Sequence, residues 1–379
     1  MVAEPKTRNV LWISPNLPRP EQDGGDLRRW QMITALSRYG TAVSVWSETG
    51  HDSGRYGPVL ENAKVTWSAP PPAARQSTHL GSGRRAIHDL VTRQPWDSIV
   101  ISFSYLADRH LAWIRKAAPA SPVLIDLGNP RFHQSPKAEE TEVANVGELE
   151  IYEKADGLIT ATEADTSALH QSLPQVAGYT FAPLAPEPPE VPQSQIDGPL
   201  VFWGNMAHHA NANAVGWWIE ELAGEVARRH GSPIPLELRG PGAGVYKSVW
   251  GTSGKLEVGA DEEPLDGARL LLLPLRHGSE TAATALLAAV RGIPVVASSA
   301  AVAGLHSSVR DHVSLGDDAE ELGRLIVQLV SDDESWRQQR DHAFAAAGAL
   351  AKRRSALEQE FANWMSRSRP VSATYSDAS

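Results

Sequence analysis

The sequence predicts an α/β protein built from two Rossmann-like, doubly wound domains. Strand and helix patterns alternate along the first 182 residues, a proline-rich segment follows, and the alternation then restarts. Such alternation is typical of parallel sheets with helices on both faces. Two halves of this kind predict two domains that face a cleft, which is a favoured place for a small-molecule site.

Length and composition agree with this fold class. The 379 residues suffice for two domains, 42% of them are hydrophobic, and the net charge is −10 with a pI near 5.7. The acidic balance argues against nucleic-acid binding. The chain has no cysteine, which excludes disulfides and thiolate catalysis and leads us to expect a cytoplasmic protein. No signal peptide or transmembrane helix is predicted, and the oligomeric state is left open.

Five apolar runs predict the strands of the first domain: residues 9–14, 42–47, 98–103, 122–127 and 157–162. Helices are expected at Leu27–Tyr39, 108–118 and 145–155, and Gly40 is expected to end the first of them. The segment Ser68–Arg85 is rich in turn residues and is predicted to be mobile.

The second domain repeats this pattern after Pro183–Pro199, where six of 17 residues are proline. Its strands are predicted at 200–204, 235–240, 269–275, 294–298 and 312–316. Two of its helices are predicted at Asn213–His230 and Ser279–Arg291. We therefore expect a domain at 1–182, a linker at 183–199, a domain at 200–350, a helix at 351–366 returning to the first domain, and a disordered tail at 367–379.

A glycine loop, "DGGDLRR", precedes the first helix. Gly24 and Gly25 allow close approach of the backbone to a ligand, and the helix N-terminus with Arg28 favours an anion. The alternative is a simple turn with Asp26 as the helix cap. The fingerprint G-x-G-x-x-G is absent from this loop, which weighs against a nicotinamide or flavin enzyme.

The second half carries three comparable strand ends. Gly204, Asn205, His208 and Asn211 follow one strand, although an ordinary loop with a helix cap explains them as well. Arg239 opens a turn after the next strand. The stretch "PLRHGSETAATALL" then places Arg276 before a helix start, where anionic ligands commonly bind.

Several enzyme classes are excluded by missing motifs. The chain has no D-x-D pair and no H-E-x-x-H, so no metal or other cofactor is expected. It has no G-x-S-x-G elbow and no G-x-x-x-x-G-K-[ST] loop, which argues against an α/β-hydrolase and a P-loop nucleotidase.

Taken together, these motifs resemble the GT-B glycosyltransferases of retaining family 4. The resemblance rests on "LWISPNLPRPEQDGGDLRRWQ", "VGELEIYEKADGLITATEADTSAL", "LVFWGNMAHHANANAVGWWIEEL" and "RGIPVVASSAAVAGL", in this order. It implies a nucleotide-diphosphate sugar donor in the second domain, an acceptor in the first, and transfer with retention and without a metal. Helix N-termini, loop amides and arginines would then stabilise the departing diphosphate.

The donor site departs from the family pattern. The usual lysine is replaced by Thr284, and the two usual glutamates by Ser279 and Leu287. Asn129 and Arg131 stand where the first domain often has an Asp and a His, although Asp126 is retained. The compensating charge is expected from one of four arginines, Arg276, Arg28, Arg29 or Arg239. Arg276, just before the turn, is the best placed, and an arginine can hold a phosphate bidentately.

The resemblance assigns the following site residues. Asp126 and Glu280 are the catalytic candidates, Glu280 alternatively being a favourable charge at a helix start. The candidates for donor and phosphate binding are Gly24, Gly25, Arg28, Gly204, Asn205, His208, Asn211, Arg239, Arg276, Gly278, Ser279, Thr281 and Thr284.

Three functions remain open. The first is an active, metal-independent glycosyltransferase acting on a natural product or glycan. The second is a catalytically degenerate relative that serves as a binding or partner subunit, which the lost lysine and glutamates favour. The third is another GT-B chemistry, such as a sugar-nucleotide epimerase.

Overall fold

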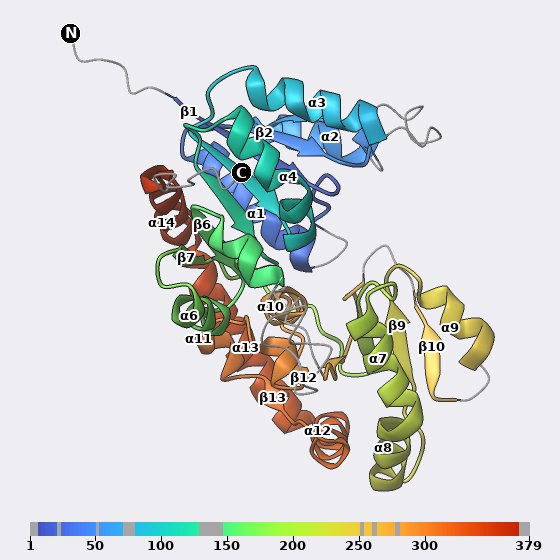
Figure 1. The fold of residues 1–379 in the computed structure, drawn as a ribbon. Helices are drawn as coiled ribbons and strands as arrows, with labels where there is room; N and C mark the ends of the chain where they lie inside the picture. Colours follow the sequence, from blue (N-terminus) through green and yellow to red (C-terminus); the bar gives the residue numbers. More distant parts are fainter. Residues whose placement is uncertain are drawn as a thin grey trace. The chain divides into compact units, whose positions relative to one another are not determined.

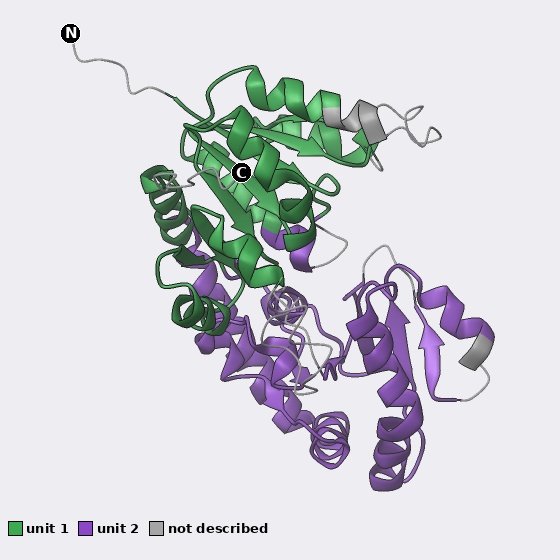
Figure 2. Cartoon of the chain, viewed as in Figure 1, with its two compact units in different colours: residues 1–19, 29–181, 356–379 green, residues 20–28, 182–355 purple. Residues whose placement is uncertain are grey.

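The computed structural model describes residues 7–20, 24–50, 53–70, 80–128, 147–250, 254–259, 264–276 and 281–370. The chain divides into two compact units, coloured green and purple in Figure 2. Unit 1 comprises Met1–Arg19, Arg29–Phe181 and Ala356–Ser379. Unit 2 comprises Pro20–Arg28 and Ala182–Ser355. Within the described ranges, every helix is too short or too polar to cross a lipid bilayer.

Unit 1 contains a parallel sheet in the order β3-β2-β1-β4-β5-β6-β7. Figure 1 labels four of these strands, β1, β2, β6 and β7. Its strands are β1 (Arg8–Ser14), β2 (Thr41–Ser47), β3 (Thr66–Ser68), β4 (Ser98–Ser102), β5 (Val123–Asp126), β6 (Gly157–Thr160) and β7 (Ala177–Thr180). The strands β4, β5 and β6 are buried along their whole length. This burial explains their continuous apolar sequences, because a central parallel strand is covered on both faces. All five predicted strands of this domain are confirmed.

The helices of unit 1 differ from prediction mainly where glycine and proline occur in the helical segment, because these residues disfavour a helix. Helix α2 includes Gly54, Gly57 and Pro58 but forms because Tyr56 and Leu60 are buried. The segment Ser68–Arg85, predicted as turns, is helical from Leu80 onward, where α3 begins, and its residues 71–79 lie outside the described residues. Residues 147–153 are helical as predicted. The helices are α1 (Gly24–Arg38), α2 (Ser53–Asn62), α3 (Leu80–Thr92), α4 (Ser104–Ala117), α6 (Glu163–Ser172) and α14 (Arg354–Arg367). The first residues of α1, as far as Arg28, and of α14, as far as Ser355, belong to unit 2.

Helix α1 begins three residues earlier than predicted. Gly24 and Gly25 are its first residues, and Asp26 therefore lies in the first turn rather than at the cap. An acidic residue there is favourable for the helix dipole. The other end follows expectation, since Gly40 has a positive φ of 84° and its N–H is bonded to the carbonyl of Ser37.

Unit 2 contains a second parallel sheet in the order β10-β9-β8-β11-β12-β13. Its strands are β8 (Leu200–Trp203), β9 (Leu236–Arg239), β10 (Leu256–Val258), β11 (Leu270–Leu273), β12 (Val295–Ala297) and β13 (Ser314–Leu315). The predicted strands of this domain are confirmed, and β10 is additional. The apolar run of β11 is completely buried, as expected for a central strand.

The helix predicted at Asn213–His230 is a three-part element. It begins earlier, at His209, and a π-helical segment interrupts it at Trp218–Leu222. A π segment adds one residue to a turn, which periodicity does not reveal. The helices of unit 2 are α7 (His209–Trp217), α8 (Ala223–His230), α9 (Ala243–Trp250), α10 (Ala282–Val290), α11 (Ser307–Arg310), α12 (Ala319–Ser331) and α13 (Asp333–Lys352).

The proline-rich segment after β7 has no regular secondary structure. It is fastened to unit 2 by the N–H of Gln193, which donates to the carbonyl of Arg291 (2.7 Å), and by the N–H of Gln195, which donates to Ala268 (3.2 Å). The segment is therefore extended, as its prolines dictate, but bonded to the surface of unit 2 over its second half.

The last helix returns to the first sheet, as predicted. Phe361 of α14 is fully buried, and its ring centroid lies 4.8 Å from that of Phe181 and 5.5 Å from that of Tyr179. Glu358, also fully buried, accepts a hydrogen bond from Arg38 of α1. These contacts make α14 part of the core of unit 1.

Candidate functional site

The carboxyl ends of β8 and β11 form the candidate site in unit 2. These two strands are neighbours, and the chain continues from β8 to β9 on one side and from β11 to β12 on the other. The strand order therefore reverses between them. Ligands of open parallel sheets bind outside the carboxyl ends at such a switch point.

The Gly204 loop leaves β8 at this point and leads into α7. The N–H of Gly204 donates to the carbonyl of Arg239 (3.1 Å), and that of Met206 donates to Pro241 (2.8 Å). A Cβ on Gly240, whose φ is 109°, would lie 2.5 Å from the Gly204 carbonyl oxygen. Glycine at position 240 is thus what allows the turns after β8 and β9 to touch.

Two predicted asparagines act inside this loop. The buried side chain of Asn211 donates to the carbonyl of Asn205 (2.9 Å), and the Asn205 side chain accepts from the N–H of Ala207 (3.0 Å). His208 is the cap residue of α7, and its N–H donates to the same Asn205 carbonyl (3.1 Å). These bonds fix the shape of the loop, so both asparagines are shown in a positioning role.

Arg239 is nearly buried and its guanidinium is engaged. Its Nε donates to Glu237 Oε1 (2.7 Å), and its Nη1 donates to the carbonyl of Asp266 (2.7 Å). Donor binding by this residue stays a prediction, and these contacts show it tying β9 to the segment before β11.

Arg276 lies three residues beyond β11 and is half-exposed. Its Cζ atom lies 4.6 Å from the centroid of the Trp217 ring at the end of α7, which is a cation–π distance. Its Nη2 lies 3.7 Å from Oε2 of Glu221, and the same oxygen accepts a hydrogen bond from Trp217 Nε1 (2.8 Å). The side chain is thereby held beside α7, at the switch point, with half of its surface open.

Trp217 and Glu221 were missed by the sequence reasoning. Their spacing of four places them on one helix face, which was a usable signal, but nothing in the sequence connected that face with Arg276. Glu221 also belongs to the π-helical segment Trp218–Leu222, a feature frequently found at functional sites.

The predicted residues that follow Arg276 are only partly described. Gly278, Ser279 and Glu280 lie outside the described residues. Thr281 precedes α10 and its hydroxyl donates to the carbonyl of Ala301 (2.8 Å). Thr284 is 5% exposed in a helix that is buried almost all round, so the position of the family's lysine faces the interior of unit 2.

The corresponding switch point of unit 1 lies between β1 and β4. Asp126, at the end of β5, is 2% exposed and its Oδ2 accepts from Ser102 Oγ (3.4 Å). Ser102 Oγ also accepts from Trp12 Nε1 (2.9 Å). The predicted catalytic Asp126 is therefore a buried carboxylate at the edge of the switch point.

Arg28 and Arg29 of α1 are both 4% exposed. Arg29 Nη1 donates to Ser14 Oγ at the end of β1 (3.2 Å), and its Cζ lies 4.9 Å from the centroid of the Phe103 ring after β4. Arg29 thus links the two strands that flank the switch point of unit 1.

Glu48 follows β2 directly and is in contact with two further ionisable side chains. Its side chain accepts from Arg109 Nη1 (2.8 Å), and its Oε1 lies 2.8 Å from Nε2 of His110. Burial alone raises the pKa of Glu48, but the hydrogen bonds from His110 and Arg109 outweigh it and lower the pKa below its usual value. Trp113 Nε1 donates to His110 Nδ1 (3.2 Å), so Nε2 carries the proton that faces Glu48.

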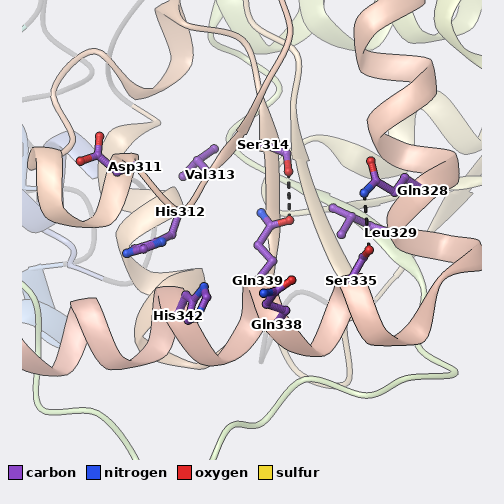
Figure 3. A pocket seen from close by; sticks show the side chains of 10 residues that line it. All are labelled: Asp311, His312, Val313, Ser314, Gln328, Leu329, Ser335, Gln338, Gln339 and His342. Atoms are coloured by element: carbon purple, nitrogen blue, oxygen red, sulfur yellow. Dashed lines mark hydrogen bonds between the residues drawn. The ribbon is translucent and has the colours of Figure 1, made fainter.

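A separate cavity of about 290 Å³ lies at the other edge of unit 2, beside β13 and α13. Figure 3 shows that its lining is mainly polar, with Gln339 bonded to Ser314 and Gln328 to Ser335. The lining contains no lysine or arginine and none of the predicted site residues. It therefore does not suit a diphosphate. Among the described residues, no group of three or more His, Asp or Glu side chains is placed to hold a metal ion.

No family model matches this sequence, and no curated protein matches it in sequence. Solved structures do match the fold. HepE from Anabaena, in a crystal structure with UDP-glucose, is similar over 94% of this chain and 99% of its own, at 14% identity and a TM-score of 0.65.

Two further glycosyltransferase structures are similar. Sucrose-phosphate synthase from Thermosynechococcus elongatus covers 94% of this chain and 98% of its own, at 14% identity and a TM-score of 0.63. WaaG, a glycosyltransferase involved in lipopolysaccharide biosynthesis, covers 94% and 99%, at 12% identity and a TM-score of 0.59. With its two parallel, helix-covered sheets, the chain has the GT-B fold of these glycosyltransferases.

Proposed function

We propose that the protein is a glycosyltransferase that takes its sugar from a nucleotide-diphosphate donor bound at the switch point of unit 2. The observation that carries the proposal is the position of Arg276. It follows β11, one of the two strands that flank the switch point, and its side chain is half-exposed. Trp217 and Glu221 hold this side chain beside α7, the helix that follows the Gly204 loop.

Arg276 would take the place of the lysine that Thr284 replaces. A guanidinium offers several N–H donors in a plane and binds a phosphate bidentately. Because the guanidinium is half-exposed and faces Glu221, solvent and this carboxylate reduce its attraction for a phosphate. The remaining attraction would help to anchor the diphosphate and to stabilise the charge that develops as it leaves.

The reaction we propose is a direct transfer with retention and without a metal. In this scheme the arginine and the backbone amides at helix starts supply the positive charge that a metal ion provides elsewhere. Asp126 would be the catalytic carboxylate on the acceptor side, in unit 1. Glu280 would accept hydrogen bonds from the hydroxyls of the donor sugar. These two assignments rest on the resemblance alone.

A nucleotide screen tests the proposal. The full chain is mixed with UDP, GDP, ADP and dTDP and with their sugar derivatives, and binding is followed by thermal shift and calorimetry. We expect a stabilisation of RT ln(1 + [L]/Kd) with one nucleotide, and slow hydrolysis of the matching donor. Absence of binding with every nucleotide would remove the proposal.

One observation favours a second candidate, a degenerate GT-B protein that acts as a binding subunit. Thr284 is buried and uncharged, so it does not supply the cation that the family's lysine would provide. This candidate predicts no nucleotide-induced shift, and it is the surviving function if the screen is negative. Conversion of the donor into a different nucleotide sugar in the absence of an acceptor, with no free sugar released, would instead indicate the epimerase chemistry.

A further inference from the structure

Phe103 has a strained backbone at the switch point of unit 1. It follows β4 directly, and its φ of 72° and ψ of 146° lie in a region that side-chain-bearing residues rarely adopt. Such a conformation costs about 1–3 kcal/mol, and such residues cluster at functional sites. The strain is held in place by the N–H of Phe103, which donates to the carbonyl of Asp126 (2.7 Å).

The surroundings of Phe103 are built to fit its ring. Gly128 has a φ of 61°, and a Cβ there would lie 2.7 Å from Phe103 Cε1. The Arg29 guanidinium lies 4.9 Å from the ring centroid. The ring of Tyr105 stacks on Phe103 with centroids 5.8 Å apart and planes 13° from parallel.

Tyr105 is the outermost member of this stack and is 51% exposed. Phe103 lies against one face of its ring, so the exposed half is turned away from Phe103. The result is a half-exposed aromatic ring in the first turn of α4, with one neighbour stacked on it. The open part of such a ring offers an apolar face on which a ligand ring can stack.

Three charged groups lie close enough to Tyr105 to influence its hydroxyl. Arg29, Arg109 and Glu48 all act on the Tyr105 hydroxyl electrostatically, and Arg109 and Glu48 are bonded to each other at 2.8 Å. Burial raises the pKa of Tyr105, so the phenol stays neutral across the physiological range.

We propose that the exposed face of Tyr105 is a stacking platform for a pyranose ring, and that the acceptor of the proposed transfer is a glycan or glycoside. The inference rests on the proposed function and names its acceptor class. A sugar ring has a C–H face that suits the negative face of an aromatic ring. Its hydroxyls can bond to the half-exposed Arg109 and to Glu48, which is bonded to it.

An aromatic acceptor with a single hydroxyl, such as a phenol, fits this place less well. It would cover Tyr105 equally, but it would also remove water from the neighbouring charges while replacing few of the lost hydrogen bonds. The charged side chains near Tyr105 therefore favour a ligand ring that is apolar on its face and polar at its edge.

Tyrosine NMR tests the proposal on the full chain. The protein is labelled with ε-¹³C-tyrosine, which gives seven residues to observe. The Tyr105 signal is assigned by its loss in Tyr105→Phe. The probes are methyl α- and β-glycosides of glucose, galactose, mannose and N-acetylglucosamine, with phenol and 4-methylphenol as the aromatic comparison. We expect at least one glycoside to shift the Tyr105 signal saturably and the phenols to leave it unchanged.

Variants give a second measurement. Tyr105→Ala should weaken glycoside binding about fivefold or more, whereas Tyr105→Trp and Tyr105→Phe keep the ring and should stay within about twofold. Tyr246→Phe, on α9 of unit 2, is the matched control and should leave binding unchanged. Because Tyr105 is half-exposed, each variant should keep the unfolding temperature of the parent.

Three results would overturn the inference: no glycoside shifts Tyr105, only the phenols shift it, or Tyr105→Ala binds glycosides as well as the parent. Nucleotide binding is measured on the same samples. If UDP and the other nucleotides bind but Tyr105 does not respond, this inference fails alone. If glycosides bind at Tyr105 but no nucleotide binds, the proposed function fails and the sugar platform stands.

Discussion

Glu221 and Arg276 form an exposed ion pair, 3.7 Å between Oε2 and Nη2, at the switch point of unit 2. The same Glu221 oxygen accepts the indole N–H of Trp217, and the Trp217 ring lies under the guanidinium. Arg276 is thus held by a carboxylate that also competes with any anion for its charge. This relationship gives the first two predictions.

Arg276→Ala should weaken binding of the matching nucleoside diphosphate by more than tenfold, which corresponds to about 1.4 kcal/mol. The reason is the loss of the cation that we place on the diphosphate. Calorimetry measures the change, and Arg276→Lys should recover part of the affinity because it restores the charge without the planar fork. Equal affinity of Arg276→Ala and the parent would place the phosphate elsewhere.

Glu221→Gln should have the opposite effect and strengthen nucleotide binding about two- to fivefold, the range expected for one exposed ion pair. Glutamine can still accept the Trp217 hydrogen bond, so the geometry is preserved while the competing charge disappears. The gain should shrink as salt is raised. Glu220→Gln is the control, because it removes the same charge from the adjacent exposed position. An equal gain in both variants would point to general electrostatics instead of competition for Arg276.

Gly240→Ala should destabilise unit 2 by about 2 kcal/mol or more. Alanine is strained at a φ of 109°, and its Cβ would lie 2.5 Å from the Gly204 carbonyl oxygen. The urea midpoint of unfolding measures the loss. Gly216→Ala provides the contrast, because a Cβ there meets nothing within 4 Å and alanine favours the helix, which should raise stability by about 0.5–1 kcal/mol. A neutral Gly240→Ala would contradict the tight packing of the two turns.

Alkaline pH should weaken unit 1 through Tyr179. Burial, followed by the negative charge of Glu360, raises the pKa of Tyr179 from 10.0 to about 12. A tyrosine whose pKa is raised on folding contributes stability below its unfolded pKa, and this contribution is lost as pH rises from about 10 to about 12. Thermal unfolding between pH 9 and pH 12 should therefore show a loss that Tyr179→Phe reduces.

Two variants sharpen this experiment. Glu360→Gln should lessen the alkaline loss, because it removes the second cause of the raised pKa. Tyr246→Phe should leave the loss as it is in the parent. If Tyr179→Phe and the parent lose stability in parallel across this range, the ionisation of Tyr179 is not linked to folding.

Much of the fold was predictable because its central strands are buried on both faces. A continuous apolar run such as Leu270–Leu273 indicates a strand that is buried on both faces. Helix α2 was not predictable, because Gly57 and Pro58 disfavour a helix locally and the burial of Leu60 overrides them. The π-helical turn at Trp218–Leu222 was hidden for a related reason, since its apolar spacing also fits a regular helix.

The site was predictable in position more than in contacts. Gly204 and Arg276 stand at the ends of strands, which the apolar runs locate, and the structure places those strands side by side. The roles of Asn205 and Asn211 inside their own loop depend on a turn geometry that the sequence does not specify. The strained Phe103 left no signal at all, because an aromatic residue after a strand normally has an extended backbone.

The return of α14 to unit 1 sets how the chain can be divided for experiments. A fragment ending near residue 182 would lack Phe361 and Glu358, and it would expose the rings of Tyr179 and Phe181 and leave Arg38 without its carboxylate. Unit 1 is therefore not a contiguous gene segment. An expression fragment of it should carry residues 356–370 fused behind Phe181 through a flexible linker, and the piece removed between them is Ala182–Ser355, the larger part of unit 2.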